Sequence, residues 1–110
     1  MSELRQGTAV GAVPIIVEHH PKRHRFAAHF PEGDGELIYK PIASHTLDLV
    51  HTEVDPALRG RGIAKALARE AFAYARREHL KIVPTCPFIR RWLEQHPEEQ
   101  DLITTRVDAT

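Results

Sequence analysis

Two glycines and three cationic side chains lie close together at residues 59–65, in the order Arg-Gly-Arg-Gly-Ile-Ala-Lys. Glycine has no Cβ atom, so the backbone at Gly60 and Gly62 can approach a ligand closely. A helical periodicity begins at residue 62, and the first amides of a helix have no internal hydrogen-bond partners. These amides and the helix dipole attract anions such as phosphate. On the residues alone, the pattern fits equally a phosphate-binding loop and a plain strand-to-helix turn with solvated arginines.

The spacing of this loop differs from that of two well-known phosphate-binding motifs. A Walker loop would require Gly-x-x-x-x-Gly-Lys-Ser/Thr, which is absent, and a dinucleotide fingerprint would require Gly-x-Gly-x-x-Gly. Here Gly60-Arg-Gly62 is followed by Ile-Ala-Lys, so the register of the fingerprint fails. What remains is Arg59-x-x-Gly62-x-Ala64. This pattern resembles the Gln/Arg-x-x-Gly-x-Gly/Ala signature of the Gcn5-related N-acetyltransferases.

The resemblance extends to a minimal branch of this superfamily. Small members of that branch have a strand ending in His-Thr-Glu-Val, then Arg-Gly-x-Gly-Ile-Ala, then Cys-Pro-Phe, and a His-Pro after a short helix. The matching residues here are 51–54, 59–64, 86–88 and 96–97. The match covers roughly residues 14–104, and the joint pattern is far more specific than any single motif.

The resemblance implies acetyl-CoA as co-substrate and assigns roles to the loop. In this family the loop amides bind the coenzyme A pyrophosphate, and the end of the fourth strand pairs its backbone with the pantetheine arm. An amide aimed at the thioester oxygen would stabilise the oxyanion that develops on attack. The implied cofactor-binding residues are Val54, Arg59, Gly60, Arg61, Gly62, Ile63, Ala64 and Lys65.

Glu53 and His51 are the candidates for a catalytic base. An alkylammonium with a pKa near ~10.4 carries no lone pair at neutral pH, so transfer to an amine requires its deprotonation. The two residues alternate onto one side of the predicted strand near its carboxyl end, where open α/β sheets place their ligands. Either could accept the proton directly or through water. We favour Glu53, and a structural hydrogen bond at the strand end is the alternative role for His51.

Cys86 is the third candidate catalytic residue. A thiol at a helix N-terminus gains thiolate character from the dipole and from nearby arginines. It could take the acetyl group and pass it on in a two-step covalent route. It could equally line the pantetheine channel without reacting, because a lone cysteine often serves as a small buried apolar residue. The sequence leaves these alternatives open.

Two departures from the family pattern leave two functions in competition. Full-sized members continue with two further strands that shape the acceptor site, and their usual tyrosine general acid has no counterpart near Trp92 and Leu93. One hypothesis is an N-acetyltransferase acting on a small-molecule or peptide amine. The other is a non-catalytic acetyl-CoA or coenzyme A sensor or interaction module. The sequence does not name the acceptor, because acceptor sites in this fold are built from variable loops.

The elements that position these residues are predicted from changes in periodicity. Short β-branched or alternating runs predict four antiparallel strands at residues 14–18, 23–30, 36–40 and 46–54. A turn is expected at 31–35 because glycine supplies the positive φ of tight turns, and Pro41 is expected to end the third strand. The fold class is therefore α/β, and the resemblance implies a truncated acetyltransferase-like fold.

The second half of the chain has the three- and four-residue apolar spacing of helices. This spacing predicts a helix from residue 62 to about 79, followed by a fifth strand at 81–85. A strand, a helix and a strand in succession imply a crossover and a parallel pair. A second helix is expected to begin at Pro87 with Cys86 as its N-cap, and to close at His96-Pro97.

Length and composition predict one small globular domain. The chain has 110 residues, with 42% apolar and 27% charged residues, so residues 1–13 are expected to form a flexible tail and 14–110 the domain. Fifteen basic and fifteen acidic residues give a formal net charge of zero, which disfavours a nucleic-acid partner. No apolar run approaches the roughly 20 residues of a membrane helix, and we expect no membrane association. The single cysteine favours a reducing cytoplasm, and a monomer or weak dimer is expected.

Eight histidines are numerous for this length. Their spacings do not repeat, they contain no helical His-x-x-x-His pair, and no second cysteine joins them. We therefore expect no metal site and interpret most of them as surface or strand residues, with a histidine-rich metal-binding domain as the weaker alternative.

Overall fold

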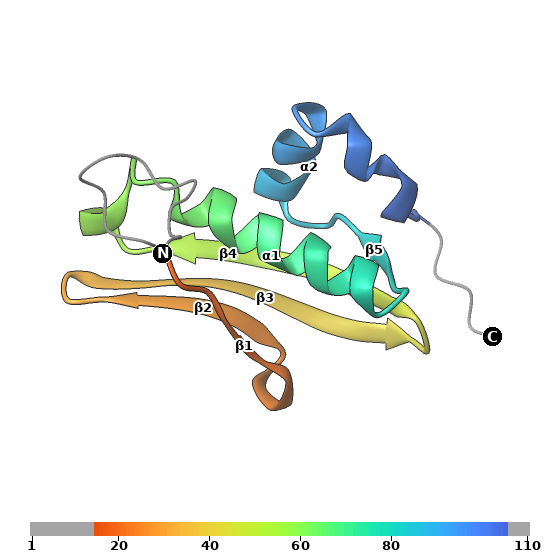
Figure 1. Cartoon of the computed structure of the whole chain (residues 1–110), viewed down its shortest axis with the longest axis horizontal. Coiled ribbons are helices and arrows are strands. Elements are labelled where there is room, and N and C mark those ends of the chain that lie inside the picture. The colour runs from red at the N-terminus through yellow and green to blue at the C-terminus, as the bar shows by residue number, and fades with distance from the viewer. Residues whose placement is uncertain (1–14, 106–110) are drawn as a thin grey trace, which may run out of the picture.

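A computed structural model describes residues 15–105 of the chain as one sheet covered on one face by helices (Figure 1). The sheet has five strands in the order β1-β2-β3-β4-β5, antiparallel from β1 to β4 and parallel between β4 and β5. The predicted fold class is confirmed. The predicted tail at residues 1–13 lies outside the described residues. The strands are β1 Glu18–His20, β2 Arg25–Phe30, β3 Gly33–Ala43, β4 Thr46–Val54 and β5 Lys81–Val83.

Helix α1 (Ile63–Arg77) connects β4 to β5 and packs along the sheet. Its alanine-rich inner face lets the helix approach the strands closely, and Leu67 and Phe72 are fully buried there. Gly35 of β3 makes this approach possible at the start of the helix, because a Cβ atom at that position would lie 2.8 Å from Cγ2 of Ile63. The helix predicted from the apolar spacing is confirmed, with its ends at Ile63 and Arg77.

The hydrophobic core lies between this helix and the strands and continues under the second helix, α2 (Pro87–Glu94). Trp92 of α2 packs against Phe72 of α1, with 4.9 Å between the ring centroids. A 3-10 helix (Pro97–Leu102) follows and is tied to α1, because Arg76 pairs with both Glu99 and Asp101. Within residues 15–105, no helix is long and apolar enough to cross a membrane.

The predicted limits of several strands are wrong. The first strand was expected at residues 14–18 but lies at Glu18–His20, because pairing with β2 sets its position. Pro41 does not end the third strand, which continues to Ala43. Pairing of β2 with β3 ends at the pair Arg25 and Ile38, so Pro41 lies where no described strand pairs with that edge of β3. A proline, which has no N–H group, is tolerated at such an edge.

A one-residue bulge in β4 sets which side chains reach the site. Ile38 pairs with His51 and Tyr39 pairs with Leu49, so Val50 is an extra residue without a partner on β3. An extra residue reverses the alternation of side chains along a strand. Leu49 therefore lies in the core, whereas His51 and Glu53 are exposed.

Strands β4 and β5 separate soon after they pair. The last pair is Asp48 with Val83, and one further bond joins the Cys86 amide to the Leu49 carbonyl at 2.9 Å. The fifth strand was predicted to reach residue 85, but it ends at Val83, just before Pro84. The chain then turns into α2, with Cys86 at its N-cap as predicted. Within the described chain, no strand pairs with this edge of β4 along residues 50–54.

Candidate functional site

The loop before α1 has the backbone shape of an anion-binding site. Gly60 and Gly62 have φ values of +83° and +80°, a region that side chains of L-residues rarely adopt. A Cβ atom added at either glycine would meet no atom of residues 15–105 within 4 Å, so the described chain leaves the space above the loop open. The sequence needs glycine here for backbone conformation, and the result is a concave surface that a ligand can reach.

The amides at the start of α1 face this open space without helical partners. The first helical hydrogen bond runs from the Ala66 amide to the Gly62 carbonyl at 3.0 Å, so the amides of residues 63–65 precede it. The side chain of Ile63 is buried in the core, and this residue can contribute only its amide. Together with the positive end of the helix dipole, these amides favour a phosphate group.

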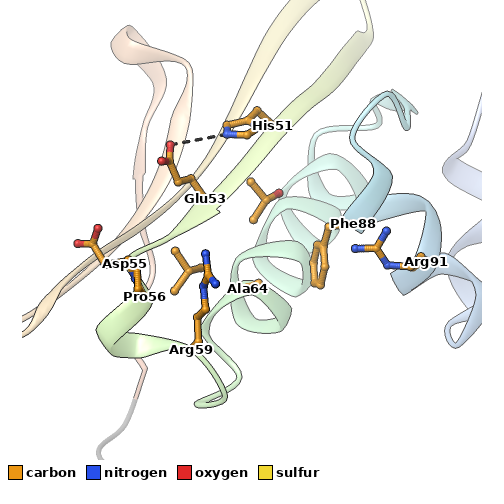
Figure 2. A pocket seen from close by; sticks show the side chains of 10 residues that line it. His51, Glu53, Asp55, Pro56, Arg59, Ala64, Phe88 and Arg91 are labelled. Atoms are coloured by element: carbon orange, nitrogen blue, oxygen red, sulfur yellow. Dashed lines mark ion pairs between the residues drawn. The ribbon is translucent and has the colours of Figure 1, made fainter.

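The cations predicted around the loop divide into two groups. Arg59 and Lys65 line the open space next to the loop, and Arg59 extends toward the end of β4 (Figure 2). Arg61 instead forms an ion pair with Glu32 of the β2–β3 turn, with 3.5 Å between Nη1 and Oε2. The structure thus brings Arg59 and Lys65 to the cleft and directs the Arg61 side chain elsewhere.

Two adjoining clefts run from this loop to the end of β4. The larger has a volume of about 500 Å³ and the smaller about 270 Å³. They share Val54, Arg59, Ala64 and Phe88, so they form one continuous surface between β4, α1 and α2. The larger cleft is lined by His51, Thr52, Glu53, Val54, Asp55, Pro56, Arg59, Ala64, Phe88 and Arg91.

The candidate bases lie together at one side of the larger cleft. His51 Nε2 is 3.6 Å from Glu53 Oε1, and their side chains are 58% and 73% exposed. Figure 2 shows both side chains on β4, with Phe88 and Arg91 of α2 across the cleft. The alternation predicted from the sequence is confirmed, because the bulge at Val50 lies before both residues and leaves their spacing intact.

Cys86 lies behind the cleft wall and lines neither cleft. Its side chain is only 3% exposed and belongs to the core cluster. The thiol donates a weak hydrogen bond to the hydroxyl of Thr52, with 3.5 Å between Sγ and Oγ1. Thr52 therefore separates the thiol from the cleft that the sequence analysis expected it to share.

The clefts contain polar and aromatic groups that the sequence analysis did not assign. Phe88 and Arg91 are three residues apart, so they share one face of α2, and that spacing was a usable signal. No tyrosine lines either cleft. Tyr39 lies elsewhere, hydrogen-bonded to His19 at 2.7 Å, and burial raises the pKa of its hydroxyl.

Comparison with known proteins identifies the family. The sequence model of the GCN5-related N-acetyl-transferase family matches residues 25–102, which span strands β2 to β5, the glycine loop and both helices. The chain belongs to the GCN5-related N-acetyltransferase family. The resemblance inferred from the motifs is confirmed.

The chain is also similar to individual proteins in sequence and in fold. Protein NATD1 of Xenopus tropicalis is 40% identical over 90 residues, which are 80% of this chain and 83% of the relative. Protein NATD1 of Homo sapiens is 38% identical over 91 residues, which are 81% of this chain and 80% of the relative. The solution structure of a GCN5-like protein from Staphylococcus aureus matches with a TM-score of 0.65 at 23% identity, covering 86% of this chain and 92% of that chain. The last comparison concerns the fold alone.

Proposed function

We propose that the chain binds acetyl-CoA across the start of α1 and the open edge of β4, and transfers the acetyl group to a primary amine. One observation carries this proposal: an open glycine loop with unpaired helix amides adjoins the edge of β4 that, along residues 50–54, no strand of the described chain covers. A helix N-terminus of this kind binds phosphate, and an open strand edge binds an extended chain that carries amide groups. The pyrophosphate and pantetheine parts of coenzyme A combine them in one molecule.

The protein groups have separate roles in holding the cofactor. The amides of residues 62–65 donate to the pyrophosphate oxygens, and Arg59 and Lys65 neutralise their charge. The backbone of residues 50–54 pairs with the pantetheine amides as it would with an added strand. Phe88 supplies an apolar wall opposite this edge. A backbone amide of β4 near the bulge stabilises the thioester oxyanion during attack.

The chemistry proposed for the amine uses the exposed side chains of His51 and Glu53 on β4, which line the larger cleft. Glu53 takes a proton from the ammonium, directly or through water. His51 lies close enough to orient the Glu53 carboxylate or to share the proton that it has accepted. The neutral nitrogen then forms a bond to the carbonyl carbon, loses its surplus proton to solvent, and the carbon–sulfur bond breaks. The sulfur can leave as a thiolate that solvent protonates, because a thiol has a pKa of only about 8.5. This explains how the reaction can proceed without a tyrosine acid.

The absence of a tyrosine from both clefts also favours a second candidate, a non-catalytic acetyl-CoA sensor. Release of free thiol from acetyl-CoA, measured with a panel of primary amines and lysine-containing peptides, separates the two functions. We expect an amine-dependent release well above the rate of acetyl-CoA hydrolysis. Saturable binding of acetyl-CoA with no amine-dependent release by any acceptor would contradict transfer and leave the sensor.

Replacement of Cys86 by alanine tests the route of transfer. We propose direct attack, because the buried thiol lies behind Thr52. The variant should retain the amine-dependent rate within about tenfold, a small change compared with the loss of a covalent nucleophile. Mass spectrometry of the unmodified protein with acetyl-CoA and no amine should show no acetylated Cys86. An acetylated Cys86 that disappears when amine is added would overturn direct attack.

A further inference from the structure

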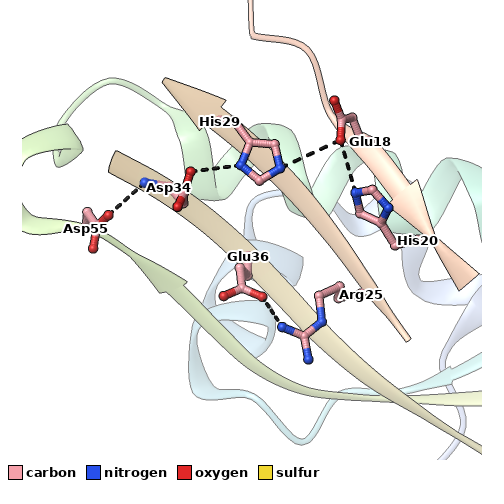
Figure 3. Close-up of polar contacts among 7 residues, drawn as sticks. All are labelled: Glu18, His20, Arg25, His29, Asp34, Glu36 and Asp55. Atoms are coloured by element: carbon pink, nitrogen blue, oxygen red, sulfur yellow. Dashed lines mark hydrogen bonds and ion pairs between the residues drawn. The ribbon is translucent and has the colours of Figure 1, made fainter. Parts of the chain in front are cut away.

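Two imidazole rings converge on one carboxylate oxygen on the exposed side of strands β1 and β2 (Figure 3). Glu18 Oε1 lies 3.0 Å from His20 Nε2 and 3.7 Å from His29 Nε2. The three potential ligand atoms all lie within 4.8 Å of one another. All three side chains are accessible to solvent, with exposed fractions between 38% and 55%.

Strand pairing brings these residues together across a sequence gap. Glu18 and His20 alternate onto one face of β1, and Glu18 is opposite Ala27 of β2. His29 is two residues beyond Ala27 and therefore points to the same face, diagonally across from Glu18. The expectation of no metal site came from the spacing of the histidines along the chain, which does not reveal a cluster that strand pairing assembles.

A second carboxylate fixes the orientation of His29. Asp34, its partner across β2 and β3, lies 2.8 Å from His29 Nδ1. Asp34 is held in turn, because its amide donates to Asp55 Oδ2 at 2.7 Å. A carboxylate on one ring nitrogen that leaves the other nitrogen free to coordinate is the usual outer arrangement of a metal-bound histidine. The neighbouring Arg25 does not oppose a cation here, since Glu36 pairs with its guanidinium (Figure 3).

We propose that Glu18, His20 and His29 form a binding site for a divalent transition-metal ion, with Zn²⁺ as the best fit. Zinc accepts nitrogen and carboxylate ligands in a tetrahedron with bonds of about 2.0–2.1 Å, so neighbouring ligand atoms lie about 3.3 Å apart. The two measured separations from Glu18 Oε1, 3.0 and 3.7 Å, lie on either side of this value. Water would complete the coordination.

The metal would join an edge strand to its neighbour. Strand β1 has three residues and, among the strands of residues 15–105, pairs only with β2. A metal that takes two ligands from β1 and one from β2 crosslinks them without a disulfide, and its binding free energy stabilises the folded chain. This role is independent of acetyl-CoA binding, because none of the three ligands lines the clefts near α1.

Calorimetric titration of ZnCl₂ into the full chain tests the site. The protein must carry no histidine tag and must be freed of metal with a chelator that is then removed. We expect one bound Zn²⁺ per chain. Replacing Asp34 by alanine should weaken binding roughly 10–100-fold, the usual cost of losing an outer-shell partner. His20→Gln and His29→Gln should weaken it further, whereas His45→Gln, which alters an exposed histidine in the β3–β4 turn, should bind as the unmodified chain does.

Nitrogen NMR of the histidine rings keeps the proposal testable should a variant fail to fold. On addition of Zn²⁺ to the unmodified chain, the Nε2 resonances of His20 and His29 should shift together and saturate at one equivalent. The proposal is overturned by the absence of stoichiometric binding. It is equally overturned if His45→Gln weakens binding as much as His29→Gln does, or if other histidines account for the shifts.

Discussion

Replacing Glu53 by glutamine is expected to lower the amine-dependent rate of acetyl transfer by roughly 10²–10⁴, the usual contribution of a general base. Glutamine keeps the size of the side chain but cannot accept a proton from the ammonium. Because Glu53 is 73% exposed, the substitution should leave folding and acetyl-CoA affinity nearly unchanged. Steady-state kinetics with the best acceptor, together with calorimetry of acetyl-CoA binding, measure both effects.

The neighbouring histidine provides the matched comparison. His51 lies on the same strand, 3.6 Å from Glu53, and is similarly exposed. We expect His51→Gln to lower the rate less than Glu53→Gln, since we assign it a supporting role. A larger loss in His51→Gln would reverse the assignment of the base, and unchanged rates in both variants would contradict acid–base chemistry at this end of β4.

Replacing Gly62 by glutamate is expected to abolish acetyl-CoA binding. The residue has a φ of +80°, so any side chain adds backbone strain of about 1–2 kcal/mol. Like charges about 4 Å apart near a protein surface repel by about 4 kcal/mol, which corresponds to an affinity loss of about a thousandfold. Calorimetry measures this loss, and circular dichroism verifies that the fold is intact.

Two control variants separate charge from strain at this position. Gly62→Ala introduces the strain without the charge and should weaken binding much less than Gly62→Glu. Ala57→Glu adds the same charge at an exposed residue outside both clefts and should leave the affinity nearly unchanged. Equal affinities for the unmodified chain and Gly62→Glu would show that the loop does not hold the phosphates.

The parts of this fold that depend on local sequence could be predicted. The glycine loop, the alanine-rich helix and the start of α2 at Pro87 follow from conformational preferences over a few neighbouring residues. The limits of β1 and the persistence of β3 through Pro41 could not, because both depend on which strands lie alongside. The bulge at Val50 depends in the same way on the register of β3.

The candidate site shows the same division between local and long-range information. The proximity of His51 and Glu53 was predictable, since alternation along one strand decides it. The ion pair of Arg61 with Glu32 was not, because the partner comes from a distant turn. The burial of Cys86 behind Thr52 depends on how α2 packs against β4, which no local pattern specifies.

Titration of acetyl-CoA into the ¹⁵N-labelled chain, followed through its backbone amide resonances, tests the central claim most directly. The account predicts saturable shifts concentrated in residues 60–65 and 50–54, with little change around Glu18 and His29 on strands β1 and β2. The absence of saturable shifts, or shifts that leave the amides of the loop before α1 unaffected, would contradict the proposed acetyl-CoA site.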